Sequence, residues 1–131
     1  MKVELELPWP PSVNHYKKVG KLMRSKNGKL YQRRVDTGRT KTFYWQVWSL
    51  IRKKGFISFG SATISVEVLA YPPDKRKRDL DGILKVLLDS LQRGGLFHDD
   101  VQVARLLVTR CPIIPEGQVI VRIEEYASCR P

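Results

Sequence analysis

Two aspartates, Asp79 and Asp81, directly follow four consecutive cations. They stand where a loop enters a helix, and their spacing of two residues lets both carboxylates reach one point. Carboxylate oxygens suit a hard cation such as Mg²⁺, which takes one or two carboxylates together with water and phosphate oxygens. A polyphosphate held by the cations would meet that metal, so the segment predicts metal-assisted phosphodiester hydrolysis. The cations are Lys75, Arg76, Lys77 and Arg78.

A structural alternative explains the same residues without chemistry. Asp79 and Asp81 suit the start of a helix, where a carboxylate caps backbone N–H groups and favours the positive end of the helix dipole. An ion pair from Asp81 to Lys85, four residues later, would add about 0.3 to 1 kcal/mol. We favour the chemical interpretation because the cations come immediately before the aspartates. Lys85 would then stabilise charge on the phosphoryl group or orient the water, and Asp89, two turns from Asp81, is not assigned to the site.

A third acidic site is the sequence His98-Asp99-Asp100, which follows a glycine turn and precedes a strand. Because the chain has reversed there, we expect Asp100 to return to the level of Asp79 and Asp81 and to join them as a metal ligand. The alternative is turn chemistry, which aspartate also serves well. His98 is a candidate proton carrier, although a loop histidine is more often simply exposed.

The hydrophobic pattern places these residues in a single α/β domain. The prolines after Leu7 end the first strand, and Asn27-Gly28 predicts the turn of a basic hairpin. The order strand, helix, strand, helix, strand, strand indicates helices packed on a small mixed β-sheet. Strands are expected at Lys2–Leu7, Ser61–Tyr71, Val101–Cys111 and Gln118–Tyr126, and helices at about Gly38–Lys54 and Asp81–Arg93.

The net charge of the chain indicates which kind of molecule it binds. The chain of 131 residues carries 24 Lys and Arg against 13 Asp and Glu, a net charge of +11. A polyanion is the natural partner for such a domain, so nucleic acid is the first expectation, and a merely soluble basic protein is the alternative. No apolar run approaches the roughly 20 residues of a membrane span, and the N-terminus lacks a signal-peptide core. We therefore expect a cytoplasmic protein that does not associate with membranes.

The cysteines and histidines give no metal site of their own. Cys111, Cys129, His15 and His98 lack the spacing of zinc ligands. Reduced thiols are the simpler expectation for the two cysteines, with a disulfide between them as the alternative.

Three separated motifs resemble one known family. They are the stretch Leu7–Asn14 (LPWPPSVN), the basic run leading into Asp79-Leu80-Asp81 with Lys85 one turn later, and the stretch Phe97–Val103 (FHDDVQV). In order and spacing they resemble the RusA family of Holliday junction resolvases, which bacteria and their prophages encode. The resemblance covers most of the chain.

This resemblance implies a RusA-like α/β fold and a homodimer that binds four-way DNA junctions and makes paired nicks with Mg²⁺ or Mn²⁺. It implies three metal-binding aspartates, Asp79, Asp81 and Asp100, and an essential lysine, Lys85. Family members commonly have Asn where this chain has Gly82, so any hydrogen bond from that side chain is absent here. The implied DNA contacts are Ser12, Val13, Asn14, His15 and the stretch with Lys75, Arg76, Lys77 and Arg78 that ends at Gly82.

Two functions of other kinds also fit part of the sequence. One is a non-catalytic basic DNA- or RNA-binding protein, in which the aspartates are helix caps. The other is a nuclease that cuts flaps or RNA instead of junctions. Cleavage assays on junction, duplex and single-stranded DNA at titrated metal concentrations separate these possibilities.

Overall fold

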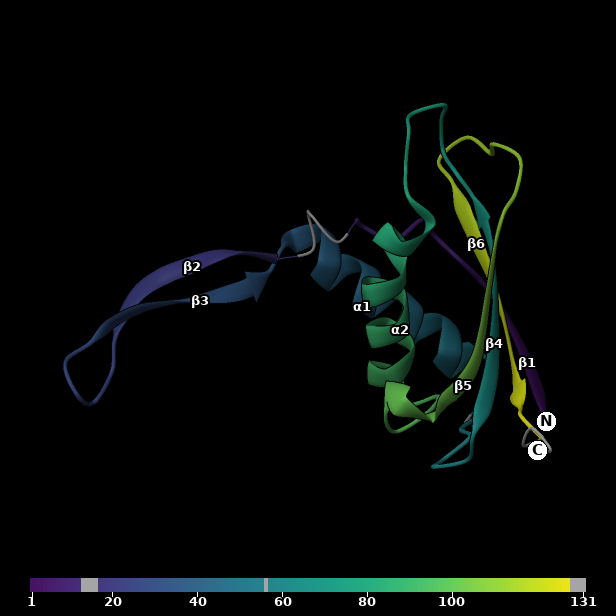
Figure 1. The fold of residues 1–131 in the computed structure, drawn as a ribbon, viewed down its shortest axis with the longest axis horizontal. Helices are drawn as coiled ribbons and strands as arrows, with labels where there is room; N and C mark the ends of the chain where they lie inside the picture. Colours follow the sequence, from purple (N-terminus) through teal and green to yellow (C-terminus); the bar gives the residue numbers. More distant parts are fainter. Residues whose placement is uncertain (13–16, 56, 128–131) are drawn as a thin grey trace.

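A four-stranded sheet, two helices and a separate two-stranded hairpin make up the fold of the computed structural model (Figure 1). The structure describes residues 1–12, 17–55 and 57–127. The predicted strands and helices are present, with shifted ends. The elements are β1 (Lys2–Leu7), β2 (Lys17–Arg24), β3 (Leu30–Asp36), α1 (Gly38–Lys53), β4 (Ile64–Tyr71), the 3₁₀ helix η1 (Leu80–Ile83), α2 (Leu84–Arg93), the 3₁₀ helix η2 (Asp100–Gln102), β5 (Val103–Arg110) and β6 (Gln118–Glu125).

The main sheet is mixed, as the sequence predicts. Its strand order is β1-β6-β4-β5, with β4 parallel to β5 and antiparallel to β6. Alternate residues of β1, β4 and β6 point into the core because successive side chains in a strand face opposite sides. Strands β1 and β5 form the two edges of the sheet.

Both helices cover the same face of this sheet (Figure 1). The side chain of Thr37 accepts a hydrogen bond from the backbone N–H of Thr40 and so caps the start of α1. The apolar stripe of α2 packs into the core, as its spacing predicts. Residues fully or almost fully buried between helices and sheet include Val47, Ile51, Val66, Val68, Val86, Leu87, Leu91 and Val121.

Strand β4, helix α2 and strand β5 form a parallel crossover. Ile64 pairs with Val103 and Ala70 pairs with Arg110, so both strands run in the same direction and α2 runs back between them (Figure 1). The loop before η1 therefore lies at the C-terminal end of β4, whereas η2 lies at the N-terminal end of β5. Between them runs α2, whose 10 residues are about 15 Å long.

The hairpin β2–β3 projects away from the rest of the chain as a long arm (Figure 1). Its strands pair antiparallel from Lys17 opposite Asp36 to Arg24 opposite Leu30. The predicted turn is confirmed, and Gly28 within it has φ of 81°, a backbone conformation that favours glycine. Among the described residues, no helix is long and apolar enough to cross a membrane.

Candidate functional site

A cleft of about 630 Å³ lies at the C-terminal end of β4. Four separate segments line it: the proline-rich stretch after β1, the start of α1, the basic loop and η1. The cleft is strongly charged, with four cations and two carboxylates on its walls. Its lining residues are Trp9, Pro10, Pro11, Ser12, Arg39, Arg76, Lys77, Arg78, Asp79, Asp81, Gly82 and Ile83.

The carboxylates of Asp79 and Asp81 both line this cleft and are exposed. Asp79 occupies the N-cap position of η1, yet its side chain makes no capping hydrogen bond. Within the part of the chain that the structure describes, neither carboxylate has a hydrogen-bond or ion-pair partner. The capping alternative is therefore wrong for Asp79, and both groups are available to a ligand.

The ion pair between Asp81 and Lys85, which belongs to the structural alternative, is also absent. Lys85 pairs instead with Asp89, one turn further along α2, with 3.4 Å between Nζ and Oδ1. The helix predicted from Asp81 begins as the 3₁₀ helix η1, and α2 proper begins at Leu84. Lys85 therefore belongs to the first turn of α2, and its exposed side chain does not line the cleft.

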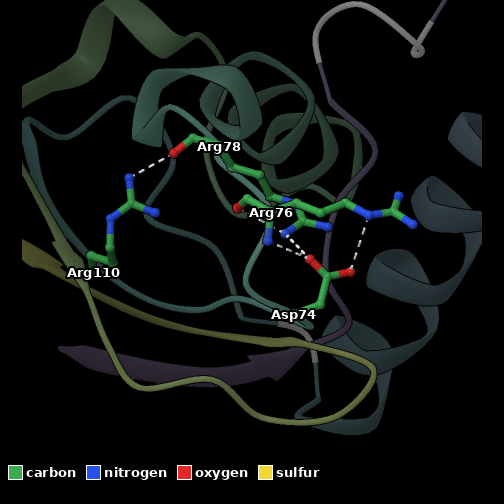
Figure 2. Close-up of polar contacts among 4 residues, drawn as sticks. All are labelled: Asp74, Arg76, Arg78 and Arg110. Carbon is green, nitrogen blue, oxygen red and sulfur yellow. Dashed lines mark hydrogen bonds and ion pairs between the residues drawn. The ribbon is translucent and has the colours of Figure 1, made fainter.

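An acidic residue that the sequence analysis did not single out organises the basic loop. Asp74 Oδ1 accepts hydrogen bonds from Nη1 of Arg78 at 2.6 Å and from the backbone N–H of Arg76 at 2.9 Å (Figure 2). The hydrogen bond from Arg78 is the main cause that lowers the pKa of Asp74 from 3.8 to about 2. Asp74 directly follows Pro72-Pro73, and an aspartate after prolines is typical of a turn.

The basic loop is also tied to the end of β5. Nη2 of Arg110 donates a hydrogen bond of 2.6 Å to the backbone carbonyl of Arg78, next to Asp79 (Figure 2). The C-terminal end of β5 therefore borders the cleft.

Asp100 does not return to Asp79 and Asp81 within one chain, so this expectation is wrong. Asp100 begins η2, at the end of α2 and of β5 that lies away from the cleft. The eight residues of β5 extend about 26 Å from this end to the end that borders the cleft. Among the described residues, no three His, Cys, Asp or Glu side chains form a group that could hold a metal ion.

The neighbours of Asp100 hold it in place. The carboxylate of Asp99 accepts a hydrogen bond from the Val101 N–H, which lowers the pKa of Asp99. Gln102 Oε1 accepts from the backbone N–H groups of His98 and Asp99, and its amide nitrogen donates to the carbonyls of Gly60 and Ala62. The hydrogen bonds that stabilise this turn therefore come from Asp99 and Gln102. The side chain of His98 is exposed.

The donor set of one chain fits a hard cation in part. Asp79 and Asp81 offer two carboxylates with no partner among the described residues, which matches the one or two carboxylates that Mg²⁺ takes from a protein. Further coordination would come from water, from phosphate or from a second copy of the chain. The surrounding cations match the phosphates of a nucleic acid.

The predicted DNA-contacting loop is only partly described. Ser12 lines the cleft together with Asp79 and Asp81. Val13, Asn14 and His15 lie outside the described residues. Of the predicted basic stretch, Arg76, Lys77 and Arg78 line the cleft, and Lys75 is exposed beside them.

Arg39 is a cleft residue that the sequence analysis missed. It is the second residue of α1 and lies beside the prolines that follow β1. Nothing in its local pattern distinguishes it from other exposed arginines, so only the tertiary structure identifies it. Trp9 shares this wall, and Gly117, with φ of 75°, lets the backbone approach Trp9 so closely that an added Cβ would lie 2.8 Å from the Trp9 Cβ.

Comparison with known proteins supports the resemblance seen in the motifs. The family model described as Endodeoxyribonuclease RusA matches residues 8–124. A protein of Enterobacteria phage HK97 named crossover junction endodeoxyribonuclease rusA is 34% identical over 124 residues, which are 93% of each chain. Proteins with the same name from Escherichia coli K12 and from Enterobacteria phage 82 are each 30% identical over 127 residues, 95% of each chain. The chain therefore belongs to the RusA family of endodeoxyribonucleases.

Proposed function

We propose that this protein is a metal-dependent endodeoxyribonuclease that resolves four-way DNA junctions by paired phosphodiester hydrolysis. One observation carries the proposal: Asp79 and Asp81 line a cation-rich cleft and have no partner among the described residues. The names of the relatives, crossover junction endodeoxyribonuclease, support the junction as substrate. Such an enzyme would work in the cytoplasm of a bacterium, where chromosomal and prophage DNA recombine.

The cations of the cleft would hold the DNA backbone. Arg39, Arg76, Lys77 and Arg78 face a common space with the two carboxylates. Contacts of this kind position a phosphate and carry no sequence information. The hydrogen bonds from Arg78 and Arg76 to Asp74 fix the loop before DNA binds, which reduces the entropy that binding must remove.

Asp79 and Asp81 would hold Mg²⁺, for which Mn²⁺ is an expected substitute. When bound, the metal supplies a nucleophilic water at neutral pH and neutralises charge on the scissile phosphate. Lys85 would stabilise the developing phosphoryl charge or orient the water. Because Lys85 pairs with Asp89 in the free protein, it must leave this partner to reach the phosphate.

A homodimer would supply the third carboxylate, since one chain keeps Asp100 away from the cleft. The edge strand β5 exposes Leu106 and Leu107, and Val101 beside Asp100 is 81% exposed. Pairing of β5 with its own copy about a two-fold axis would reverse the strand ends. Asp100 of the second copy would then approach the end of β5 where Arg110 contacts the basic loop.

A cleavage assay tests the proposed function. With Mg²⁺, the wild type should nick a four-way junction in pairs and leave linear duplex intact. Asp79→Asn and Asp81→Asn should each abolish nicking while junction binding persists or tightens, because the changes remove negative charge near the phosphates. Glu125→Gln, an exposed carboxylate at the far end of β6, is the control with the same change in charge and should nick normally.

Other outcomes would overturn the proposal. Full nicking by Asp79→Asn would contradict the assigned metal site. Preferential cleavage of flaps or RNA would show that the four-way junction is not the substrate. Tight binding without cleavage of any substrate, at all metal concentrations, would leave a basic nucleic-acid-binding protein instead of an enzyme.

A further inference from the structure

The arm formed by β2 and β3 is a large surface with little support from the rest of the chain. It projects away from the sheet and helices (Figure 1). Five large apolar side chains on it are exposed, namely Val19, Leu22, Met23, Leu30 and Val35, at 36–62%. An isolated two-stranded hairpin is at best marginally stable in water. Exposed apolar side chains on a poorly supported hairpin are typical of a surface that binds a partner.

The charge of the arm selects the kind of partner. Residues 17–36 contain eight Lys and Arg and one Asp, so the arm carries a net charge of +7 of the +11 of the chain. A polyanion matches this charge. A second copy of the chain matches it less well, because it is basic as well, and three acidic residues on its exposed sheet face are already paired. Glu4 and Glu67 contact Arg122, and Glu124 contacts Lys2.

In sequence, the arm is flanked on both sides by residues that line the cleft. Ser12, five residues before β2, and Arg39, three residues after β3, both line the cleft. At its base, Asp36 pairs with Arg93 of α2 at 3.5 Å, and the Arg93 guanidinium lies 4.3 Å from the centre of the Tyr44 ring. These contacts fix the base of the arm to both helices, so the arm leaves the cleft in a defined direction.

We propose that the arm is a second DNA-binding element, which lies along a groove of one junction arm while the cleft holds the phosphate to be cut. This inference rests on the proposed function. The eight residues of β2 extend about 26 Å, which corresponds to roughly 7 to 8 base pairs of DNA. A two-stranded β ribbon fits the major groove. The cations of the arm contact phosphates, and its apolar side chains near the tip bury against the DNA.

A charge variant with a matched control tests the phosphate contacts. Arg24, Lys26 and Lys29 lie at the tip, and their side chains have no partner among the described residues. Changing all three to Gln should weaken junction binding roughly tenfold and reduce the slope of log K against log salt by about 2 to 3. The control changes Lys2, Lys53 and Lys54, which are exposed elsewhere, to Gln. It has the same net charge and should bind like the wild type.

A variant that lacks two apolar side chains tests the proposed apolar contact between the arm and DNA. Leu22 and Leu30 share one face of the arm, because Leu22 lies opposite Gln32 and Leu30 lies opposite Arg24. Changing both to Thr retains strand propensity. Junction affinity should fall while the salt slope stays unchanged, since no ionic contact is removed.

The length of the junction arms gives a test that does not depend on protein stability. Wild-type protein should bind junctions with 15-base-pair arms more tightly than junctions with 5-base-pair arms, because about 7 base pairs are needed to reach the tip of the protein arm. The tip charge variant should bind both junctions equally. Binding is measured without divalent metal, so that no substrate is cut.

The outcomes separate this inference from the proposed function. A wild type that neither binds nor cuts junctions contradicts the proposed function itself. A wild type that cuts junctions, with arm variants that bind identically to it, contradicts the arm inference alone. Arm variants that become monomers in sedimentation experiments without DNA would show that the arm holds a second copy, which also overturns the inference.

Discussion

The carboxylate of Asp74 accepts a 2.6 Å hydrogen bond from the guanidinium of Arg78, four residues later, and thereby folds the basic loop onto itself (Figure 2). This contact presents the backbone of the loop, and with it Asp79, at the mouth of the cleft. An acidic residue thus positions the cations that are proposed to bind phosphate.

The Asp74 contact has a defined pH dependence. The pKa of Asp74 is lowered from 3.8 to about 2, chiefly by the hydrogen bond from Arg78. A lowered pKa in the folded state means that the contact contributes stability above about pH 4 and is lost as the pH falls towards 2. An NMR titration of the Asp74 carboxyl carbon should therefore show a midpoint near 2. In Arg78→Gln the midpoint should move up towards 3.8, and an unchanged midpoint would show that Arg78 is not the cause.

Much of this fold is predictable from local patterns in the sequence. Alternation in Lys2–Leu7 and helical spacing from Phe43 to Ile51 predict elements that the structure contains. Asp79 and Asp81, two residues apart, also line the same cleft. Each of these features depends on residues that are close in sequence, where periodicity determines which side chains share a face.

The position of Asp100 shows where such reasoning fails. A strand, a helix and a second strand that runs parallel to the first form a crossover, in which the two connecting loops lie at opposite ends of the sheet. The loop with Asp79 and the turn with Asp100 are those two connections. The sequence His98-Asp99-Asp100 predicts a chain reversal towards the first loop, but the sequence alone does not determine the direction of β5. Arg39 was missed for a related reason, since its place in the cleft depends on how α1 packs beside the prolines after β1.

Two glycines at the ends of the same helical segment should respond oppositely to substitution. A Cβ on Gly82 meets nothing within 4 Å, whereas a Cβ on Gly94 would overlap Cδ1 of Ile51 and lie 3.2 Å from the Ser90 carbonyl. Ile51 is 1% exposed and packed in the core, so it cannot move freely. Gly94→Ala should destabilise the fold by about 1 to 3 kcal/mol. Gly82→Ala should be neutral or stabilising by up to about 1 kcal/mol.

Urea unfolding followed by circular dichroism measures both changes. Equal stability of Gly94→Ala and wild type would show that α1 and α2 do not pack as closely as the structure has them. The Gly82 variant is the control for a glycine replaced at the other end of the segment.

Lys85 should affect cleavage without affecting the fold. Its ion pair with Asp89 is exposed, and such pairs contribute about 0.3 to 0.5 kcal/mol on a helix. Lys85→Gln should therefore leave the free energy of unfolding within about 0.5 kcal/mol of wild type, while single-turnover nicking falls by about 100-fold or more. Asp89→Asn breaks the same ion pair but keeps the lysine, so it should nick junctions at close to the normal rate.

The comparison of these two variants isolates the role of the charge. If both variants lose nicking to the same degree, nicking depends on the ion pair and not on the lysine charge itself. If Lys85→Gln unfolds, the side chain has a structural role that its exposed position does not indicate.

Mixed dimers give the sharpest test of how Asp100 acts. Asp79→Asn and Asp100→Asn should each be inactive as pure proteins. In a mixed dimer with sites shared between chains, one site contains both changes, and the other combines an intact Asp79 and Asp81 with an intact Asp100 from the partner. Refolding the two variants together should therefore restore nicking, but only one cut per junction instead of a pair.

The alternative arrangement gives a different result. If each chain used its own Asp100, every site in the mixed dimer would contain one change and no activity would return. Native mass spectrometry establishes that mixed dimers have formed, and refolding each variant with itself is the control. Restored single nicks would agree with the opposite placement of Asp79 and Asp100 along α2, because the intact site must draw its carboxylates from two copies. A mixture that forms dimers yet stays inactive would contradict the shared site and require α2 and β5 to rearrange within one chain.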